Sequence, residues 1–309
     1  MKLFKTLLVF MRKNPALIGF IILFVVLSIF TDSFFNLYNI VNVIRQVSIM
    51  AILGFGMTLV IISGGIDLSV GSTFAFSAVV MASIVKDGRV LLGIIVGLLI
   101  GAAIGAFNGI VISKGKIQPF IVTLATMAIG RSLTLAYTEG IPISLFPDSF
   151  RFLGRGDIFG IPVPILIMLG IFFLSLYILK KTKLGLYIYA IGGNEEATKL
   201  SGVNVDRYKT IVYMLSGLFS AISAIILTAR LNSAQATFGQ GYELDAIATV
   251  VLGGASLAGG KGGVLGTLFG ALLLGTINNG MNLMNISPFY QDLVKGVIIL
   301  LAVLSEKEE

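Results

Sequence analysis

The sequence of 309 residues contains no cysteine and no histidine. Without cysteine the chain forms no disulfide bond and no thiolate site, and without histidine it lacks the commonest general base and metal ligand. The nearest match to a phosphate-binding loop, GGKGG at 259–263, has glycine after Lys261 where such a loop needs serine or threonine. We therefore predict that the chain is not an enzyme, holds no metal and binds no cofactor.

Charged residues are also scarce, at 12%, whereas soluble domains have about 25%. Hydrophobic residues make up 56% of the chain, the mean hydropathy is +1.00, and apolar runs of about 20 residues recur. These features predict an all-α polytopic membrane protein in which residues 1–309 form a single transmembrane domain. Basic residues in cytoplasmic loops then explain the net charge of +7, so no nucleic-acid partner is expected.

Apolar segments predict about ten transmembrane helices, some short enough to be half-helices, with eight as the alternative. If the N-terminus is inside, cytoplasmic segments hold fourteen Lys or Arg residues and the opposite loops hold four. This asymmetry favours a cytoplasmic location for both termini. The expected spans are 16–30, 41–63, 68–85, 90–112, 118–137, 162–180, 209–230, 243–258, 263–284 and 289–304.

Two motifs recur in the same order and suggest an internal repeat with halves at roughly 41–137 and 209–304. NGIVISKGKIQPF at 108–120 is similar to NGMNLMNISPF at 279–289, and LVIISGGIDLSVGS at 59–72 is echoed by ATVVLGGASLAGGKGG at 248–263. The copies lie about five spans apart, an odd offset that predicts an inverted repeat of the kind found in transporters. Chance similarity between glycine-rich apolar segments is the alternative.

Glycine recurs at every fourth position within the span 90–112 and forms one smooth helix face. Such a face lets helix backbones approach closely, so we predict helix packing in preference to a pore lining. The residues are Gly93, Gly97, Gly101, Gly105 and Gly109.

One carboxylate, Asp67, lies in the otherwise apolar and small-residue stretch GGIDLSVGS. We expect Gly64 and Gly65 to break the second span near the cytoplasmic face, and Asp67 to cap the next helix by accepting amide hydrogen bonds from residues such as Ser69 or Val70. An ion site is the alternative. It is disfavoured because the echoed motif has Ser256 at the matching place, and serine caps helices but does not hold a cation as a carboxylate does.

The longest polar cytoplasmic segment, 180–209, contains GGNEEATKLSG, which predicts a loop followed by a short helix. Asn194 suits the N-cap, Glu195 and Glu196 suit the first turn, and Gly202 suits the end of the helix. The segment is either an ordinary surface connector or a helix that docks on a soluble partner.

Four stretches together resemble the ribose/xylose/galactose branch of sugar ABC permeases. They are GMTLVIISGGIDLSVGS at 56–72, GLYIYAIGGNEEATKLSGVNVDR at 185–207, GYELDAIATVVLGGASLAGGKG at 241–262 and NNGMNLMNISPFYQDLVKGVIILLAVL at 278–304. The resemblance runs over roughly 15–305 and is strongest to permeases for ribose. EATKLSG is similar to the E-A-A-x-x-x-G loop of ABC importer permeases, with Thr198 as the departure. The resemblance therefore implies an ATPase-docking loop at Asn194, Glu195, Glu196, Ala197, Thr198 and Gly202.

The resemblance implies the larger, ten-helix importer fold in a bacterial cytoplasmic (inner) membrane, surrounded by lipid. It also implies a second permease copy, a partner ATPase that uses ATP-Mg, and an extracytoplasmic sugar-binding protein. The cargo would be a monosaccharide, with ribose favoured. An ion-coupled secondary sugar transporter is the alternative, since inverted repeats and an intramembrane carboxylate suit that class too.

A neutral sugar needs hydrogen-bonding groups without fixed charge, so we predict amide side chains along the translocation pathway. The candidates are Asn278, Asn279 and Asn282, with Asn108 as the repeat equivalent of Asn279; these amides would alternatively bond neighbouring helices. Asp292 and Lys295, three residues apart, are expected to pair on one helix face.

Overall fold

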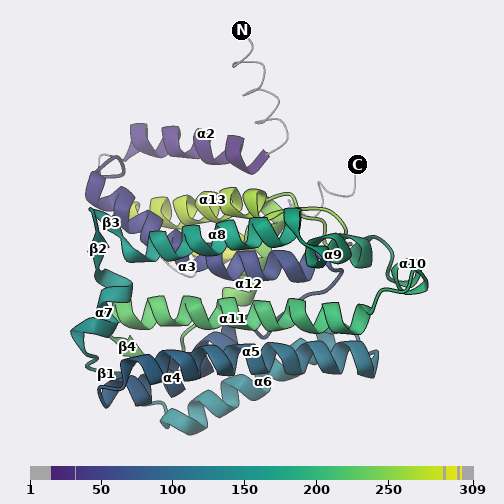
Figure 1. The fold of residues 1–309 in the computed structure, drawn as a ribbon. Coiled ribbons are helices and arrows are strands. Elements are labelled where there is room, and N and C mark those ends of the chain that lie inside the picture. Colours follow the sequence, from purple (N-terminus) through teal and green to yellow (C-terminus); the bar gives the residue numbers. More distant parts are fainter. Residues whose placement is uncertain (1–14, 32, 288–289, 298–299, 301–309) are drawn as a thin grey trace.

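The computed structural model describes residues 15–31, 33–287, 290–297 and 300. These residues are mostly helical, and the long helices run side by side with α2 at one edge of the bundle and α6 near the opposite edge (Figure 1). The helices are α2 (Pro15–Phe30), α3 (Leu37–Ile62), α4 (Val70–Lys86), α5 (Val90–Gly115), α6 (Pro119–Thr138), α7 (Asp148–Arg155), α8 (Val163–Lys181), α9 (Lys183–Gly193), α10 (Glu195–Leu200), α11 (Val205–Leu231), α12 (Tyr242–Leu252) and α13 (Val264–Leu283).

Within the described part of the chain, six helices are long and apolar enough to cross a membrane, namely α3, α5, α6, α8, α11 and α13. Two shorter apolar helices, α2 and α4, accompany them. The expected eighth span is shorter than predicted because α12 has only 11 residues, and residues 290–297 are helical within the expected last span. The prediction of a polytopic helical membrane protein is confirmed.

Short strands and the helix α7 gather at one end of the bundle, which we call the strand end. Strand β1 (Ile143–Ser144) pairs antiparallel with β4 (Ser233–Ala234), and β2 (Asp157–Ile158) pairs antiparallel with β3 (Ile161–Pro162). The helices α9 and α10 lie at the opposite end, where α10 projects from the bundle (Figure 1). We call this the α10 end.

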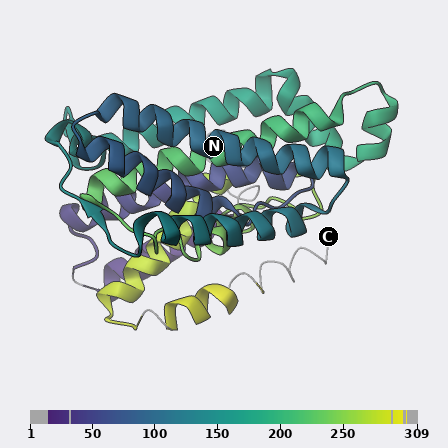
Figure 2. The same cartoon turned by 90° about the horizontal axis from the view of Figure 1, so that it is seen from below.

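The centre of the bundle is formed by α3, α4 and α11. The second half of α3 is almost completely buried, and Phe55, Met57 and Leu59 are fully inaccessible. Among the described residues, α5 and α11 form the most extensive helix–helix contact. The helical residues 290–297 lie with α13 at one edge of the bundle (yellow in Figure 2).

The glycine face of α5 lies in helix–helix contacts. Gly101, Gly105 and Gly109 abut the backbone of α11, at Gly217, Tyr213 and Thr210 respectively. Two further glycines, Gly93 and Gly97, abut side chains of α4. The face is therefore occupied by protein along its length, which is the geometry expected of a packing motif.

Of the two motif pairs that predicted an inverted repeat, the pair of GG motifs, at 59–72 and 248–263, does not fit it, and that part of the prediction is wrong. The two GG motifs lie side by side, because the Gly260 amide donates to the Ile62 carbonyl at 2.9 Å, whereas an inverted repeat would place them at opposite ends. Their similarity is a local one: Gly64 and Gly254 each end a helix with positive φ, of 81° and 84°. Glycine favours this helix-ending turn wherever it occurs.

The other motif pair, which begins at Asn108 and at Asn279, lies as an inverted repeat requires. Asn108 lies seven residues before the end of α5, on the α10 side, whereas Asn279 bonds Asn39 in the first turn of α3, at the strand end. In each motif a residue with left-handed backbone follows the helix, three positions before the proline: Lys116 with φ 51° after α5, and Asn285 with φ 55° after α13. The equivalent helices α5 and α13 therefore run in opposite directions.

Candidate functional site

The short helix α10 is capped as its sequence predicts. The Asn194 side chain accepts a hydrogen bond from the Ala197 amide at 2.9 Å, and both glutamates occupy the first turn, where carboxylates stabilise the helix dipole. The helix is followed by Gly202, which has a φ of 84°. Thr198, the departure from the E-A-A pattern, is buried and donates to the Asn194 carbonyl at 2.7 Å, so the hydroxyl is accommodated within the helix.

The outer face of α10 is free in the single chain. Leu200 is 87% exposed, and the helix projects beyond the ends of its neighbours (Figure 1). A single exposed apolar side chain is common on protein surfaces, so the docking interpretation rests on the projecting position of α10. An ion pair between Lys209 and Glu195 at 2.5 Å joins α10 to α11.

The helix α9 connects α10 to both GG motifs, whose turns (the GG turns) follow α3 and precede α13. Gly192 lies against the Ile62 carbonyl so closely that a side chain there would collide with it, and the Tyr189 hydroxyl donates to the Gly262 carbonyl at 2.8 Å. Displacement of α10 would therefore reach the end of α3 and the loop before α13 through one short helix.

Asp67 lies in a hydrogen-bonded network that is closed to solvent. Its Oδ1 accepts from the amide and the hydroxyl of Ser69, at 3.0 and 2.6 Å, and its Oδ2 accepts from the Ser216 hydroxyl at 2.8 Å. The network continues as Asn108 donates to Ser69 Oγ at 2.9 Å and Thr126 donates to Asn108 Oδ1 at 2.6 Å. The network thus links the turn before α4 to α11 directly through Asp67, and to α5 and α6 through Ser69 and Asn108.

The position of Asp67 differs in two respects from the prediction. The N-cap of α4 is Ser69, which makes no side-chain cap bond, so Asp67 binds the amide two residues ahead from a turn that precedes the helix. Asp67 is also only 1% exposed, and its partner Ser216 lies eleven residues into α11, about 16 Å from the start of that helix at 1.5 Å per residue. It therefore lies within the bundle, and not at the inner mouth of a channel, as its place beside a break near the cytoplasmic face would suggest.

The four candidate pathway amides fall into two groups. Asn108 belongs to the Asp67 network, and Asn279 exchanges two hydrogen bonds with Asn39, at 3.0 and 2.9 Å. These two bond neighbouring helices, as the alternative interpretation states. Asn278 and Asn282 instead line a cavity.

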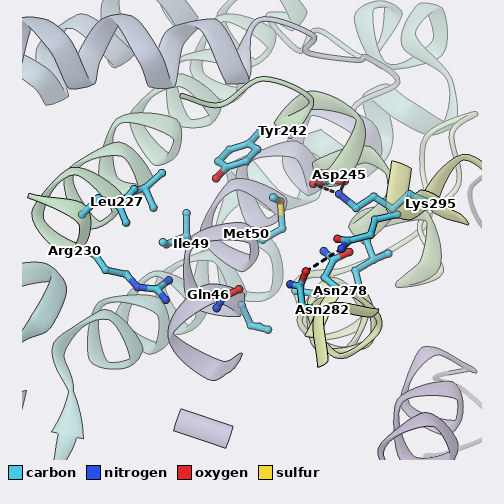
Figure 3. Close-up of a pocket in the computed structure, with 16 residues that line it drawn as sticks. Gln46, Ile49, Met50, Leu227, Arg230, Tyr242, Asp245, Asn278, Asn282 and Lys295 are labelled. Atoms are coloured by element: carbon cyan, nitrogen blue, oxygen red, sulfur yellow. Dashed lines mark hydrogen bonds and ion pairs between the residues drawn. The ribbon is translucent and has the colours of Figure 1, made fainter. Parts of the chain in front are cut away.

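The cavity lies at the strand end and has a volume of about 370 Å³. Arg230 borders it from α11, Tyr242 from α12, and Asn278 and Asn282 from α13 (Figure 3). Its full lining consists of Gln46, Val47, Ile49, Met50, Leu227, Arg230, Leu231, Tyr242, Asp245, Ala271, Leu274, Gly275, Asn278, Asn282, Gln291 and Lys295.

Lys295 joins the helical residues 290–297 to α12. Its ammonium lies 3.1 Å from Asp245 Oδ1 and 3.6 Å from Asp292 Oδ1, so the expected Asp292–Lys295 pair is confirmed. The shorter contact with Asp245 was not predicted, because the two residues are 50 positions apart and no sequence periodicity links them.

Among the described residues, no group of three or more histidine, cysteine, aspartate or glutamate side chains could hold a metal ion. The segment between α6 and α8 forms β1, α7, β2 and β3. One ion pair, between Arg45 and Asp157 at 3.2 Å, attaches this segment to α3.

Comparison with known proteins shows one family over nearly the whole chain. Residues 39–303 match the family described as branched-chain amino acid transport system / permease component. The ribose import permease protein RbsC of Bacillus subtilis (strain 168) is 51% identical over 302 residues, covering 97% of this chain and 94% of the relative. The L-arabinose transport system permease protein AraH of Escherichia coli (strain K12) is 42% identical, covering 94% and 89%.

No solved structure matches the chain. A probable ABC transporter permease protein, YphD of Escherichia coli (strain K12), is 39% identical over 285 residues, covering 92% of this chain and 86% of the relative. The extent of these matches and the bundle of apolar helices lead to the same assignment: the chain belongs to the branched-chain amino acid transport system / permease component family, within which it is similar to sugar ABC permeases.

Proposed function

We propose that this chain is the membrane permease subunit of an ATP-driven ABC importer that carries a monosaccharide, with ribose as the favoured cargo, into the cytoplasm. The observation that carries the proposal is the 51% identity to a ribose import permease over 97% of the chain. The capped, projecting helix α10 supports it, because an importer subunit without a phosphate-binding loop needs a surface on which a separate ATPase docks.

The assembly proposed is two copies of the chain, an ATPase that hydrolyses ATP-Mg and an extracytoplasmic sugar-binding protein, in a bacterial cytoplasmic membrane. The α10 end is then cytoplasmic, with both termini on that side, and the strand end faces the binding protein. We further propose ten spans with inverted halves at 41–137 and 209–304. The antiparallel placement of Asn108 and Asn279 supports this arrangement.

In this proposal α9 transmits the motion of the ATPase. Closure of the ATPase would move α10, and Gly192 and Tyr189 in α9 would carry that displacement to the two adjoining GG turns. The turns connect α3 to α4 and α12 to α13. A shift of either pair would change which end of the bundle is open to sugar.

Ion-coupled secondary transport is disfavoured by the surroundings of Asp67. Both carboxylate oxygens accept hydrogen bonds from protein donors, whereas a sodium site needs further oxygen ligands directed at the cation. The residue is better explained as part of the network that links the turn before α4 to α11, α5 and α6.

Sugar identity is tested by uptake into liposomes that contain the chain with its cognate ATPase and binding protein. Labelled ribose is expected to enter with ATP, and unlabelled ribose to compete better than arabinose, xylose or galactose. Stronger competition by another sugar would reassign the cargo and leave the transporter class intact.

The docking role of α10 predicts a large effect at Leu200. Leu200→Glu places a charge on the exposed apolar side chain and is expected to weaken ATPase association by about tenfold or more, as loss of an interface hot spot of about 1.4 kcal/mol or more does. The measurement is ATPase retention by the purified permease.

The matched control is Phe159→Glu, which charges a fully exposed aromatic side chain at the strand end. ATPase retention should be unchanged in that variant. Equal loss of ATPase in the two variants, or no loss in Leu200→Glu, would contradict docking at α10.

A further inference from the structure

The cavity at the strand end has the shape and composition of a small-molecule site. Its volume of about 370 Å³ lies within the range of about 300–1,000 Å³ typical of ligand pockets. The floor is apolar, with Val47, Ile49 and Leu274 buried, whereas Gln46 and Asn282 form an exposed rim.

Hydrogen-bonding groups from several helices surround this space. Asn278 on α13 is the most informative, because its Oδ1 is buried and has no hydrogen-bond partner among the described residues. Buried amide oxygens are nearly always paired, so an unfilled acceptor beside a cavity indicates a site for a donor from a ligand or water. The adjacent Asn282 Oδ1 accepts from Gln291 at 2.8 Å.

The cavity is also lined by an aromatic ring and by a guanidinium group that could contact a ligand. Tyr242 borders it from α12, and the guanidinium of Arg230 points toward Gln46 across the space (Figure 3). An aromatic side chain packs against the apolar C–H face of a sugar, and a guanidinium supplies hydrogen-bond donors to hydroxyl oxygens.

The charge balance suits a neutral ligand. The second cation of the lining, Lys295, is already held by Asp245 at 3.1 Å and by Asp292 at 3.6 Å. Arg230 and Lys295 bring two positive charges to the cavity, and Asp245 with the neighbouring Asp292 brings two negative charges, so the charges at the site balance. A polyhydroxylated neutral ring makes hydrogen bonds to all these groups without disturbing that balance.

We propose that this cavity receives one neutral monosaccharide at the strand end of the permease, with a sugar hydroxyl donating to Asn278 Oδ1. Arg230 and Asn282 contact the remaining hydroxyls, and Tyr242 packs on the ring. This inference rests on the proposed function, since it names where the imported sugar first binds within this chain.

The natural chain contains no cysteine, so a single introduced thiol reports on one position. In liposomes containing the complete importer, Gln46→Cys on the exposed rim of the cavity is treated with a water-soluble methanethiosulfonate reagent, with and without ribose, and labelling is read as the mass shift of this chain. Ribose at about ten times its dissociation constant should slow labelling about tenfold by mass action. Asp87→Cys, exposed at the end of α4, is the control that ribose should not protect, and mannitol controls for osmolarity.

Absence of protection of Gln46→Cys in vesicles where the unmodified importer carries ribose would overturn this site and leave the proposed function standing. Failure of the unmodified importer to carry ribose with ATP would overturn both. Protection by ribonate without protection by ribose would contradict a neutral ligand.

A second measurement separates sugar binding from folding. Asn278→Leu removes the free acceptor and should lower the number of sugars imported per ATP hydrolysed about tenfold, the change expected when a hydrogen bond worth about 1.4 kcal/mol is lost. Ile277→Leu, at an adjacent position outside the lining, should retain the unmodified ratio. An unchanged ratio in Asn278→Leu would contradict the proposal.

Discussion

Replacement of Asp67 by leucine is expected to destabilise the permease by about 3–5 kcal/mol. The substitution leaves the Ser69 amide, the Ser69 hydroxyl and the Ser216 hydroxyl without their acceptor. Each buried donor without a partner costs about 1–3 kcal/mol, and rotation of the two hydroxyls to other acceptors recovers part of that loss. The measurement is the midpoint of thermal unfolding of the purified permease, together with its yield.

Asp67→Asn is the matched control. The asparagine Oδ1 can accept from Ser69, and its Nδ2 can donate to Ser216 Oγ, whose hydroxyl is free to rotate. We expect stability within about 1 kcal/mol of the natural chain and near-normal transport. If Asp67→Leu were as stable as Asp67→Asn, the network would not hold the helices together. If Asp67→Asn folded but did not transport, the carboxylate would have a direct part in gating.

Gly105→Ala is expected to have an effect of similar size through packing alone. A Cβ at this position would overlap the Tyr213 carbonyl and lie 2.9 Å from Met214 Cα. Both neighbours are backbone atoms of α11, which cannot rotate away as a side chain can. Overpacking of a tight contact costs about 1–3 kcal/mol and occasionally more, and we expect about 3 kcal/mol or more here, measured as loss of folded protein and a lower unfolding midpoint.

Gly170→Ala supplies the control because a Cβ on Gly170, within α8, meets no atom within 4 Å. This variant should be as stable as the natural chain or up to about 1 kcal/mol more stable, since alanine is the better helix former. Equal stability of Gly105→Ala and Gly170→Ala would mean that α5 and α11 do not depend on close backbone approach.

Features that depend on neighbouring residues in the sequence were predictable. The cap at Asn194, the acidic first turn and the terminal Gly202 follow local rules of helix formation, and the four-residue spacing of glycines placed one smooth face on α5. Apolar runs in the sequence likewise predicted where the helices lie, although α12 is shorter than the apolar run 243–258 from which it was predicted.

Contacts between distant helices were not predictable in the same way. The partners of Asp67, Asn279 and Lys295 depend on how helices are placed beside one another, and one sequence carries no record of that placement. The false GG repeat has a related cause. Glycine ends helices throughout proteins, so two similar turns at Gly64 and Gly254 need not be symmetry equivalents.

The distinction between the two pairs of amides also required the structure. Asn278 and Asn279 are adjacent in the sequence, yet Asn279 bonds Asn39 on α3 while Asn278 borders the cavity with a free oxygen. The side chains of consecutive helical residues point in directions about 100° apart. Two neighbours of the same type can therefore serve packing and ligand binding respectively.

The central claim is that ATP hydrolysis by a partner chain drives sugar through this permease, and ribose uptake into liposomes under two treatments tests it most directly. We predict that uptake continues after ionophores collapse the proton and sodium gradients, and falls to background when the ATPase chain is omitted. Uptake that stops with the ionophores and persists without the ATPase would contradict the claim and identify an ion-coupled transporter.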